Sequence, residues 1–314
     1  MRNTFRRNIQ MKKIILITLS IVFVFLMFNS CGKRLGYTYE KTDGGIKITG
    51  YTGEETVLVI PEKIGKRKVV AIGKNAFDMQ SVESVEIPDS VEVIERYAFR
   101  RCAKLTSVKL PNGLKEIADG TFSFCSNLDK IDIPKTVERI GNNAFGVTAI
   151  KEVVLPDSVK KVEEYAFYNC SQLESFTSGS GLTELGKYAL ASCKALKKIE
   201  LNEGLKIVGE SCFQGSSLAD GIILPSSVEK LSMFVFAYTD IKSYTILPSI
   251  KVIEYCAFEG CESLKDIYIP DTVEEMQSDI FEKCKDFTIH GALNSKAQIY
   301  SDTYGYDFEE YKFD

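Results

Sequence analysis

The sequence lacks tryptophan, and its 314 residues include a single histidine, His290. One imidazole excludes a metal site built from several histidines, and we expect His290 to be exposed or half-buried near the C-terminal end. The chain also lacks the G-x-S-x-G, H-E-x-x-H and EF-hand motifs of common hydrolases, zinc proteases and calcium sites. From these absences we expect no catalytic residue, no metal site and no cofactor.

Two features imitate functional motifs without meeting their requirements. Residues 181–188, GLTELGKY, match a phosphate-binding loop until Tyr188, where the loop needs the hydroxyl of Ser or Thr to hold Mg²⁺. Adjacent carboxylates such as Glu163–Glu164 are common in a chain with 26% charged residues, and they are typical of a solvated face. General acid–base catalysis needs a desolvated pocket that separates two carboxyl pKa values, and no pattern in the chain indicates one.

Long apolar runs are absent except for one near the N-terminus. The run from Ile14 to Phe28 follows five basic residues and is shorter than the roughly 20 residues that span a bilayer, so residues 1–30 read as a secretory signal peptide, with Met11 as an alternative start. The sequence FNSC at 28–31 resembles a bacterial lipoprotein signal, in which the cysteine is acylated and becomes the first residue. This predicts lipidation of Cys31; the alternative is simple cleavage that leaves Cys31 an ordinary thiol.

Positive charge is scarce once this leader is removed. The leader contains five of the 39 basic residues and none of the 43 acidic ones, so the remaining chain has nine more acidic than basic residues. Nucleic acids and anionic lipid surfaces both require a basic face. We therefore expect no nucleic-acid partner, and membrane contact only through the lipid on Cys31.

Phenylalanine and proline recur at fixed intervals, and this repeat is the dominant feature of the chain. All eight prolines follow a short β-like stretch, and the Phe of an AF motif returns every 22 or 23 residues, once as Leu. Such a period predicts a solenoid in which each unit buries its apolar side only against its neighbours. The ten positions are Phe77, Phe99, Phe122, Phe145, Phe167, Leu190, Phe213, Phe236, Phe258 and Phe281.

One unit shows how the repeat folds. In LTSVKLP (105–111), Val108 and Leu110 alternate with polar residues, the period of a half-buried strand. Pro111 ends the strand because it has no N–H to donate. Phe122 then fills the core beneath a short helical or irregular turn. About ten such turns predict a rod with a parallel sheet along one side.

Nine cysteines in an exported chain would normally suggest disulfides. Six of them, however, occupy one slot three residues after the Phe position, where we expect a small buried hydrophobe. Stacked neighbours would have parallel Cβ vectors, a poor disulfide geometry, so we predict free thiols. The six are Cys102, Cys125, Cys170, Cys193, Cys261 and Cys284.

The phrases IPDSVEVIERYAFRRCAKL (87–105) and IPKTVERIGNNAF (133–145) resemble the BspA-type leucine-rich repeat family, and the resemblance covers about 56–290. The lead-in at 48–77 resembles that family's N-terminal unit, with a hairpin over the first turn, and 291–306 resembles its C-terminal cap. The resemblance implies an α/β, right-handed solenoid with a parallel sheet on the concave face. It also implies an exported, often lipid-anchored bacterial protein used for adhesion or protein binding.

These patterns divide the chain into a signal peptide (1–30), an anchor and linker (31–47), the solenoid (48–290), and a C-terminal cap and tail (291–314). The repeat is irregular in mid-chain, where FTSGSG at 176–181 lacks the proline phrase, Leu190 replaces Phe, and Gly221 opens a strand position. We expect the rod to bend or loosen between about 176 and 222.

A candidate binding surface comes from the residues two positions before each proline, which strand alternation places outward. This column is mostly polar until Ile223, Ile246 and Tyr268, with Tyr244 on the face of Ile246. Consecutive exposed apolar and aromatic residues mark interaction sites, so we predict protein binding through these four. Two alternatives remain: the register shifts by one residue there, or a C-terminal segment covers them.

The leading hypothesis is a non-catalytic surface or periplasmic lipoprotein, with an extracellular or envelope protein as its partner. It would be exported and anchored on the outer face of a bacterial membrane. The alternatives are an envelope component that binds copies of itself, and an enzyme or enzyme inhibitor with an unrecognised carboxylate site.

Overall fold

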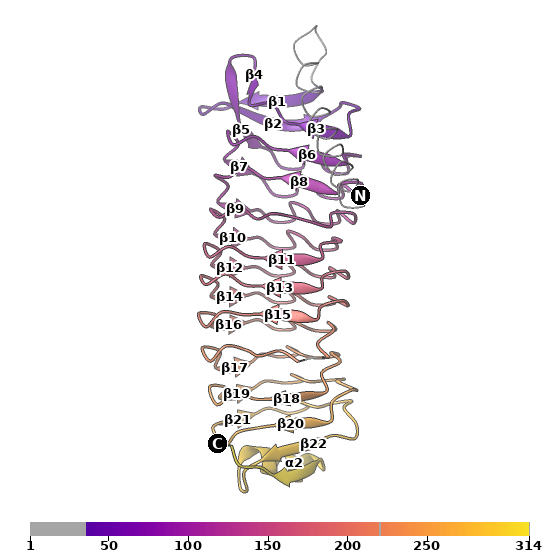
Figure 1. Ribbon diagram of the computed structural model, residues 1–314, viewed down its shortest axis with the longest axis vertical. Coiled ribbons are helices and arrows are strands. Elements are labelled where there is room, and N and C mark those ends of the chain that lie inside the picture. The colour runs from indigo at the N-terminus through magenta and orange to yellow at the C-terminus, as the bar shows by residue number, and fades with distance from the viewer. Residues whose placement is uncertain (1–35, 220, 314) are drawn as a thin grey trace, which may run out of the picture. The chain divides into compact units, whose positions relative to one another are not determined.

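The computed structural model describes residues 36–219 and 221–313. The expected signal peptide and Cys31 lie outside the described residues. Tyr37–Asp314 is one compact unit, a β-solenoid of about eleven turns of about 23 residues with parallel sheets (Figure 1). Among the described residues, no helix is both long enough and apolar enough to cross a membrane.

The first column of strands, which we call the pre-proline ladder, runs along one side of the stack. Most of these strands bury the central residue and leave its flanks exposed or half-buried, as Val108 is buried between Ser107 and Lys109; in β15 the central Ile199 is half-buried. Neighbours pair in parallel one repeat apart, so that Val108 lies beside Val85. The strands are β3 (Val57–Val59), β6 (Ser84–Glu86), β8 (Ser107–Lys109), β11 (Glu152–Val154), β13 (Ser175–Thr177), β15 (Lys198–Glu200), β18 (Ser243–Thr245) and β20 (Asp266–Tyr268).

A second parallel column, the two-residue ladder, runs along the stack beside the first (Figure 1). The repeat pattern did not predict it, because two residues per turn are too few to show a period of two. The second residue of most of these strands is buried, as Ile140 is in β10. The strands are β7 (Val93–Ile94), β9 (Glu116–Ile117), β10 (Arg139–Ile140), β12 (Lys161–Val162), β14 (Glu184–Leu185), β16 (Ile207–Val208), β17 (Lys230–Leu231), β19 (Val252–Ile253) and β21 (Glu275–Met276).

The segment around each AF motif is irregular rather than helical, but most of these segments are hydrogen-bonded to the next turn. The residues two before and two after the Phe adopt left-handed backbone angles, as Tyr97 (φ 62°) and Arg101 (φ 59°) do around Phe99. This conformation points the Phe N–H along the stack to the carbonyl before the next Phe, as from Phe99 to Thr121 (2.9 Å). We call this series the AF ladder, and it continues at every junction from Phe77 to Phe258, with distances of 2.8–3.1 Å.

The core between the ladders is a column of aromatic rings. Phe77, Phe99, Phe122, Phe145 and Phe167 stack with centroids 4.9–5.6 Å apart and near-parallel planes. Leu190 interrupts the column, and the larger Phe176 of β13 packs edge-on against Phe167 at 5.9 Å. All these side chains are fully buried, so Phe176 compensates for the volume that Leu190 lacks.

The cysteine slot supplies a hydrogen-bond donor to this core. All eight described cysteines are free, and the six repeat cysteines are buried except the half-buried Cys284, as predicted. Each of the six thiols donates to the Phe-position carbonyl of the preceding turn, as Cys125 does to Phe99 (3.1 Å). Ser216 occupies the same slot and donates to Leu190 (2.6 Å). The slot therefore favours a small side chain with a donor, and burial raises the pKa of the Cys170 thiol to about 11.

The N-terminal end is covered by an antiparallel hairpin at 37–51, which begins before the 48–77 lead-in expected to supply it. β1 (Tyr37–Lys41) and β2 (Ile46–Tyr51) are antiparallel, β2 pairs in parallel with β5 (Arg67–Ile72), and β4 (Lys63–Ile64) completes the sheet. The Tyr51 ring lies 5.7 Å from Phe77 and so ends the aromatic column. Because β1 falls within 31–47, the folded unit begins earlier than the expected solenoid boundary.

The C-terminal end is covered by β22 (Thr288–Gly291), α2 (Lys296–Tyr304) and β23 (Asp307–Glu310). α2 is the expected cap helix; Ser295 caps its first turn, and Gly305 ends it in a left-handed conformation. The Tyr300 hydroxyl accepts from the Ile280 N–H (3.0 Å), which satisfies a donor at the end of the AF ladder. β23 pairs with β22, so the tail is part of the sheet.

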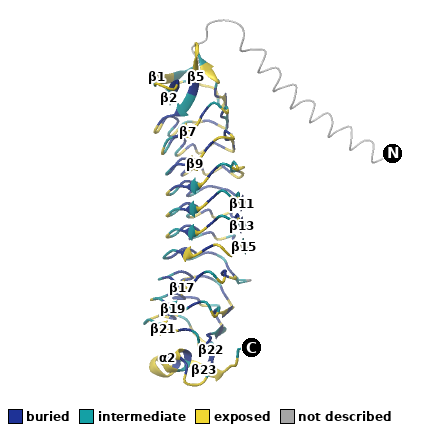
Figure 2. Cartoon of the chain, turned by 90° about the vertical axis from the view of Figure 1, so that its left-hand side faces the viewer, coloured by how far each residue is buried: buried dark blue, intermediate teal, exposed yellow. Residues whose placement is uncertain are grey.

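Both outer ladders stop at one level of the stack. The pre-proline ladder has no strand at 221–224, between β15 and β18, and the two-residue ladder is broken between β16 and β17. The pre-proline ladder also lacks a strand at 130–133, between β8 and β11, and β7 does not pair with β9, but these two breaks lie at different junctions. Figures 1 and 2 show the wider interval between turns there. The AF ladder continues across it, from Leu190 to Cys212 (2.9 Å) and from Phe213 to Val235 (3.1 Å).

The expected irregularity at 176–181 is wrong, and the interruption lies nearer the C-terminus. β13 pairs on both sides, and the glycines of FTSGSG let this turn approach its neighbour closely. A Cβ atom on Gly179 would collide with the Pro156 carbonyl, and one on Gly181 with the Asp157 carbonyl. These glycines tighten the stack instead of loosening it.

The Phe column generates a prediction about stability. Phe122 is fully buried, whereas Phe124 in the same turn is 44% exposed. We expect Phe122→Ala to lower the free energy of unfolding by about 3–5 kcal/mol and Phe124→Ala by less than about 1 kcal/mol. Denaturant unfolding followed by circular dichroism measures both, and equal midpoint shifts would contradict the core assignment.

Candidate functional site

Only part of the predicted surface is exposed. Ile223 is 82% exposed, but Tyr244 is 6% and Ile246 0% exposed, so the expected exposure of these two is wrong. Pro248 stands ten residues before Phe258, whereas Pro225 stands eleven before Phe236. Counting back from Pro248 therefore selects core residues, as the alternative of a one-residue register shift allowed.

The strand register identifies the true outward residue of that turn. Thr245 pairs with Tyr268, while Tyr244 pairs with the buried Ile267. Thr245 is exposed, and it was missed because the count began from a displaced proline. A count from the Phe of the AF motif would have found it.

Tyr268 is half-buried because the tail covers it. Its ring stacks on His290 (4.4 Å between centroids), and Tyr311 meets it edge-on at 4.9 Å. His290 is 8% exposed, and its Nε2 lies 2.8 Å from Asp266 Oδ1. The expectation of an exposed or half-buried histidine is therefore wrong, and the four predicted residues do not form one patch.

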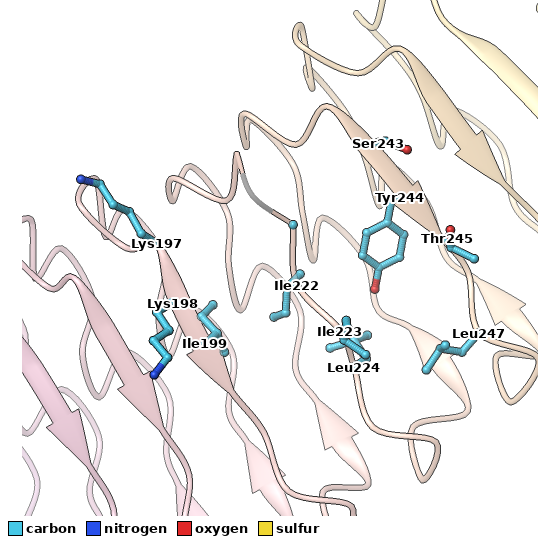
Figure 3. A pocket seen from close by; sticks show the side chains of 11 residues that line it. Lys197, Lys198, Ile199, Ile222, Ile223, Leu224, Ser243, Tyr244, Thr245 and Leu247 are labelled. Atoms are coloured by element: carbon cyan, nitrogen blue, oxygen red, sulfur yellow. The ribbon is translucent and has the colours of Figure 1, made fainter.

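Ile223 instead stands in a groove of about 540 Å³, at the interruption of the pre-proline ladder (Figure 3). The walls come from β15, from 221–224 and from β18 with the residues after it. Six of the lining side chains are apolar or aromatic: Ile199, Ile222, Ile223, Leu224, Tyr244 and Leu247. The volume lies within the range of about 300–1,000 Å³ that is usual for ligand sites.

The backbone along this groove lacks its ladder partners. At regular junctions the residue before the proline donates to the next turn, as Leu155 does to Thr177 (2.9 Å). Leu224 occupies that position, but neither it nor Ile222 nor Ile223 donates a backbone hydrogen bond to a described residue. Gly221 begins the segment at φ 81°, with open space where a Cβ would lie, and this conformation takes the chain off the strand path.

Tyr244 brings a hydroxyl to the same place. Its ring packs between Phe236 (5.2 Å) and Phe258 (5.5 Å) in the core, and it extends from β18 toward 223–224 (Figure 3). The hydroxyl makes no hydrogen bond to a described residue, and burial raises the pKa of Tyr244 well above its usual value. Tyr244 is 6% exposed, but its oxygen is not one of the buried side-chain oxygens without a partner, so the hydroxyl opens onto the groove and is available to a ligand.

The charge at the groove is positive. Lys197 and Lys198 are the only charged side chains among the described residues that line it. Lys198 is paired with Glu200 (2.8 Å), and this hydrogen bond raises the pKa of Lys198. Lys197 is exposed, and it makes no ion pair with a described residue.

A second cluster brings together Cys256, Glu259 and Glu282, whose donor atoms lie within 4.8 Å of one another. Glu259 already accepts hydrogen bonds from the Lys283 ammonium and the Tyr238 hydroxyl. Burial acts to raise the pKa of Glu259, but the hydrogen bonds from Lys283 and Tyr238 outweigh it and lower the pKa. Because the ammonium occupies the place of a cation, the cluster is a cross-turn ion pair, and the expected absence of a metal site stays a prediction.

Comparison with known proteins gives relatives of one kind. The sequence model of the BspA-type leucine-rich repeat region matches residues 70–196 and 160–288. A leucine-rich repeat protein from Bacteroides ovatus ATCC 8483 is 27% identical, with a TM-score of 0.74 over 84% of this chain and 71% of its own. The T. pallidum leucine-rich repeat protein TpLRR is 31% identical, with a TM-score of 0.56 over 59% of this chain and 89% of its own. No curated protein sequence matches.

The corrected register can be tested with a matched pair of variants. We expect Ile246→Ser to lower the free energy of unfolding by about 3–5 kcal/mol, because it removes buried apolar area and places a hydroxyl in the core. Ile223→Ser should change it by no more than about 0.5 kcal/mol. Urea unfolding measures the difference, and a larger loss for Ile223→Ser would show that the register is still misassigned.

Proposed function

The chain belongs to the BspA-type leucine-rich repeat family, and from that premise we propose that it is a non-catalytic protein-binding module. It acts outside the cell or in the envelope, is exported by the leader at 1–30, and is held on the outer face of a bacterial membrane by lipid on Cys31. Its ligand is an extracellular or envelope protein.

The open face of the pre-proline ladder carries this proposal. Its inward positions repeat apolar residues, whereas its outward positions change from turn to turn: Lys109, Val154, Thr177, Glu200, Ile223 and Thr245. No described segment covers this face between β8 and β18, and all these residues are exposed or half-exposed. A rigid, repetitive support with a variable outer surface suits recognition of a macromolecule.

The carboxyl groups support a non-catalytic role. Every described carboxyl with a resolved shift, namely Asp89, Asp157, Glu200 and Glu259, has its pKa lowered. A carboxylic acid that donates a proton near neutral pH needs a raised pKa, which comes from a desolvated site. The clustered carboxylates instead pair with cations, as Glu116, Asp119 and Glu163 do around Arg139.

Few residues separate Cys31 from the first strand, and this limits how far the solenoid could lie from a membrane. β1 begins at Tyr37, six residues after Cys31, and six extended residues span roughly 20 Å. An acylated Cys31 would therefore hold the N-terminal hairpin close to the membrane surface.

The anchor can be tested in the native host or a bacterial host that processes lipoproteins. We expect Cys31→Ala to leave the membrane fraction or to remain uncleaved, because durable anchoring takes two acyl chains or more. Cys256→Ala, which alters a partly exposed cysteine within the solenoid, should fractionate like the wild type. Normal cleavage together with full membrane retention of Cys31→Ala would contradict the anchor.

Protein binding is tested separately with the purified protein on immobilised extracellular-matrix proteins and envelope extracts. We expect saturable binding to at least one protein, with competition by unlabelled protein. The absence of any such partner, with concentration-dependent self-association in sedimentation, would favour the alternative of an envelope component that assembles with itself.

A further inference from the structure

We propose that the groove at 221–224 binds an extended, acidic peptide segment of a partner protein. This inference rests on the proposed protein-binding function and names the place and the chemistry of recognition. Four properties of the groove point to such a segment: its unpaired backbone groups, the unpaired hydroxyl of Tyr244, its apolar lining, and its charge.

The backbone groups favour an extended chain. Ile222, Ile223 and Leu224 have N–H groups that in most other turns are paired along the stack, and here they meet no described acceptor. An extended peptide presents carbonyls and N–H groups at the spacing of a strand, which is how peptides add to exposed strand edges. A helix satisfies its own backbone and could not supply these groups.

The Tyr244 hydroxyl adds a specific donor. It is carried on a ring that the core holds between Phe236 and Phe258, so its position is fixed before any ligand arrives. The hydroxyl opens onto the groove and donates to no described residue, so a peptide carbonyl there would accept its hydrogen bond in place of water. This makes the site pre-organised for a chain that brings acceptors.

The lining favours apolar side chains on one face of the peptide. Ile223 is exposed by 82%, more than any other large hydrophobic residue in the described chain. Ile199, Leu224 and Leu247 line the same groove. A side chain entering beside Ile223 would remove this surface from water, and anchors of that kind dominate binding energy.

The charge favours acidic residues on the other face. Lys197 and Lys198 border the groove, and no described acidic residue lines it. Lys242 is exposed just before β18. A peptide that alternates apolar and acidic residues would place carboxylates toward these lysines while its apolar side chains enter the groove.

The test uses the purified protein and three fluorescein-labelled synthetic peptides. The first alternates Glu and Val around a central Ile; the second replaces each Glu by Lys; the third keeps the first sequence with alternate backbone nitrogens methylated. Fluorescence anisotropy should show binding of the first peptide, with at least about tenfold weaker binding of the other two. Equal binding of all three, or no binding of the first, overturns the proposal.

Variants locate the site. Ile223→Ser should weaken the first peptide by at least about tenfold, whereas Val154→Ser changes the same outward column in the paired strand β11 and should alter binding less than about twofold. Tyr244→Phe removes only the hydroxyl and should weaken binding by about threefold to tenfold with an unchanged unfolding midpoint. Equal effects of Ile223→Ser and Val154→Ser would overturn the assignment to the groove.

The same variants separate this inference from the proposed function. If a protein partner binds wild type and Ile223→Ser equally well, protein binding stands and the groove is excluded. If the peptide binds at the groove but no protein partner is found, the groove stands and the proposed function fails. A change of oligomeric state in Ile223→Ser would assign the groove to a second copy of the chain and overturn the peptide proposal.

Discussion

The hydrogen bond from each Phe-position N–H to the next turn is the interaction on which the rest of the structure depends. It requires left-handed backbone angles on both sides of the Phe, and most of the residues that adopt them are not glycine. Such conformations cost of order 1 kcal/mol each. The buried Phe offsets that cost, because a fully buried Phe contributes about 1.5–3 kcal/mol and also stacks on its neighbours. The strain, a buried apolar side chain and the ladder bond therefore occur together along the stack, and the side chain is a ring at every position except Leu190.

The continuity of the AF ladder explains how the other two ladders can stop. At the level of 221–224 the stack loses its pairing on both outer sides, yet Phe213 still donates to Val235, and Ser232 Oγ donates to Val208 (2.6 Å), the carbonyl that normally accepts a backbone N–H. A solenoid held by one ladder alone would open most readily at this point, because few backbone bonds protect it. The interruption is thus a local property of the outer ladders, while the core column remains filled.

The repeat could be predicted from the sequence because its signals are large and local: a Phe, a proline and a cysteine at fixed spacing. The core and the free thiols follow directly from them. The side chains that face outward near Tyr244 and Ile246 could not be predicted from the sequence. Pro248 is displaced by one residue, and the alternation of inward and outward side chains is reversed with respect to it. The burial of Tyr268 and the interruption of the two outer ladders at 221–224 both depend on segments that are far apart in the sequence. Tyr311 packs on Tyr268, and 221–224 lacks the backbone hydrogen bonds to neighbouring turns.

The same missing bonds give the groove its affinity. In an uninterrupted ladder every N–H of the pre-proline strands is paired and the outward face offers side chains alone. At 221–224 the backbone donors and the Tyr244 hydroxyl must be satisfied by water or by a ligand, beside an apolar surface that disfavours water. A peptide that brings acceptors and apolar side chains together satisfies both requirements, whereas water satisfies only the first. Recognition at this site would therefore arise from the backbone hydrogen bonds that 221–224 does not make within the fold. An inserted peptide would also connect the turns on either side of this segment.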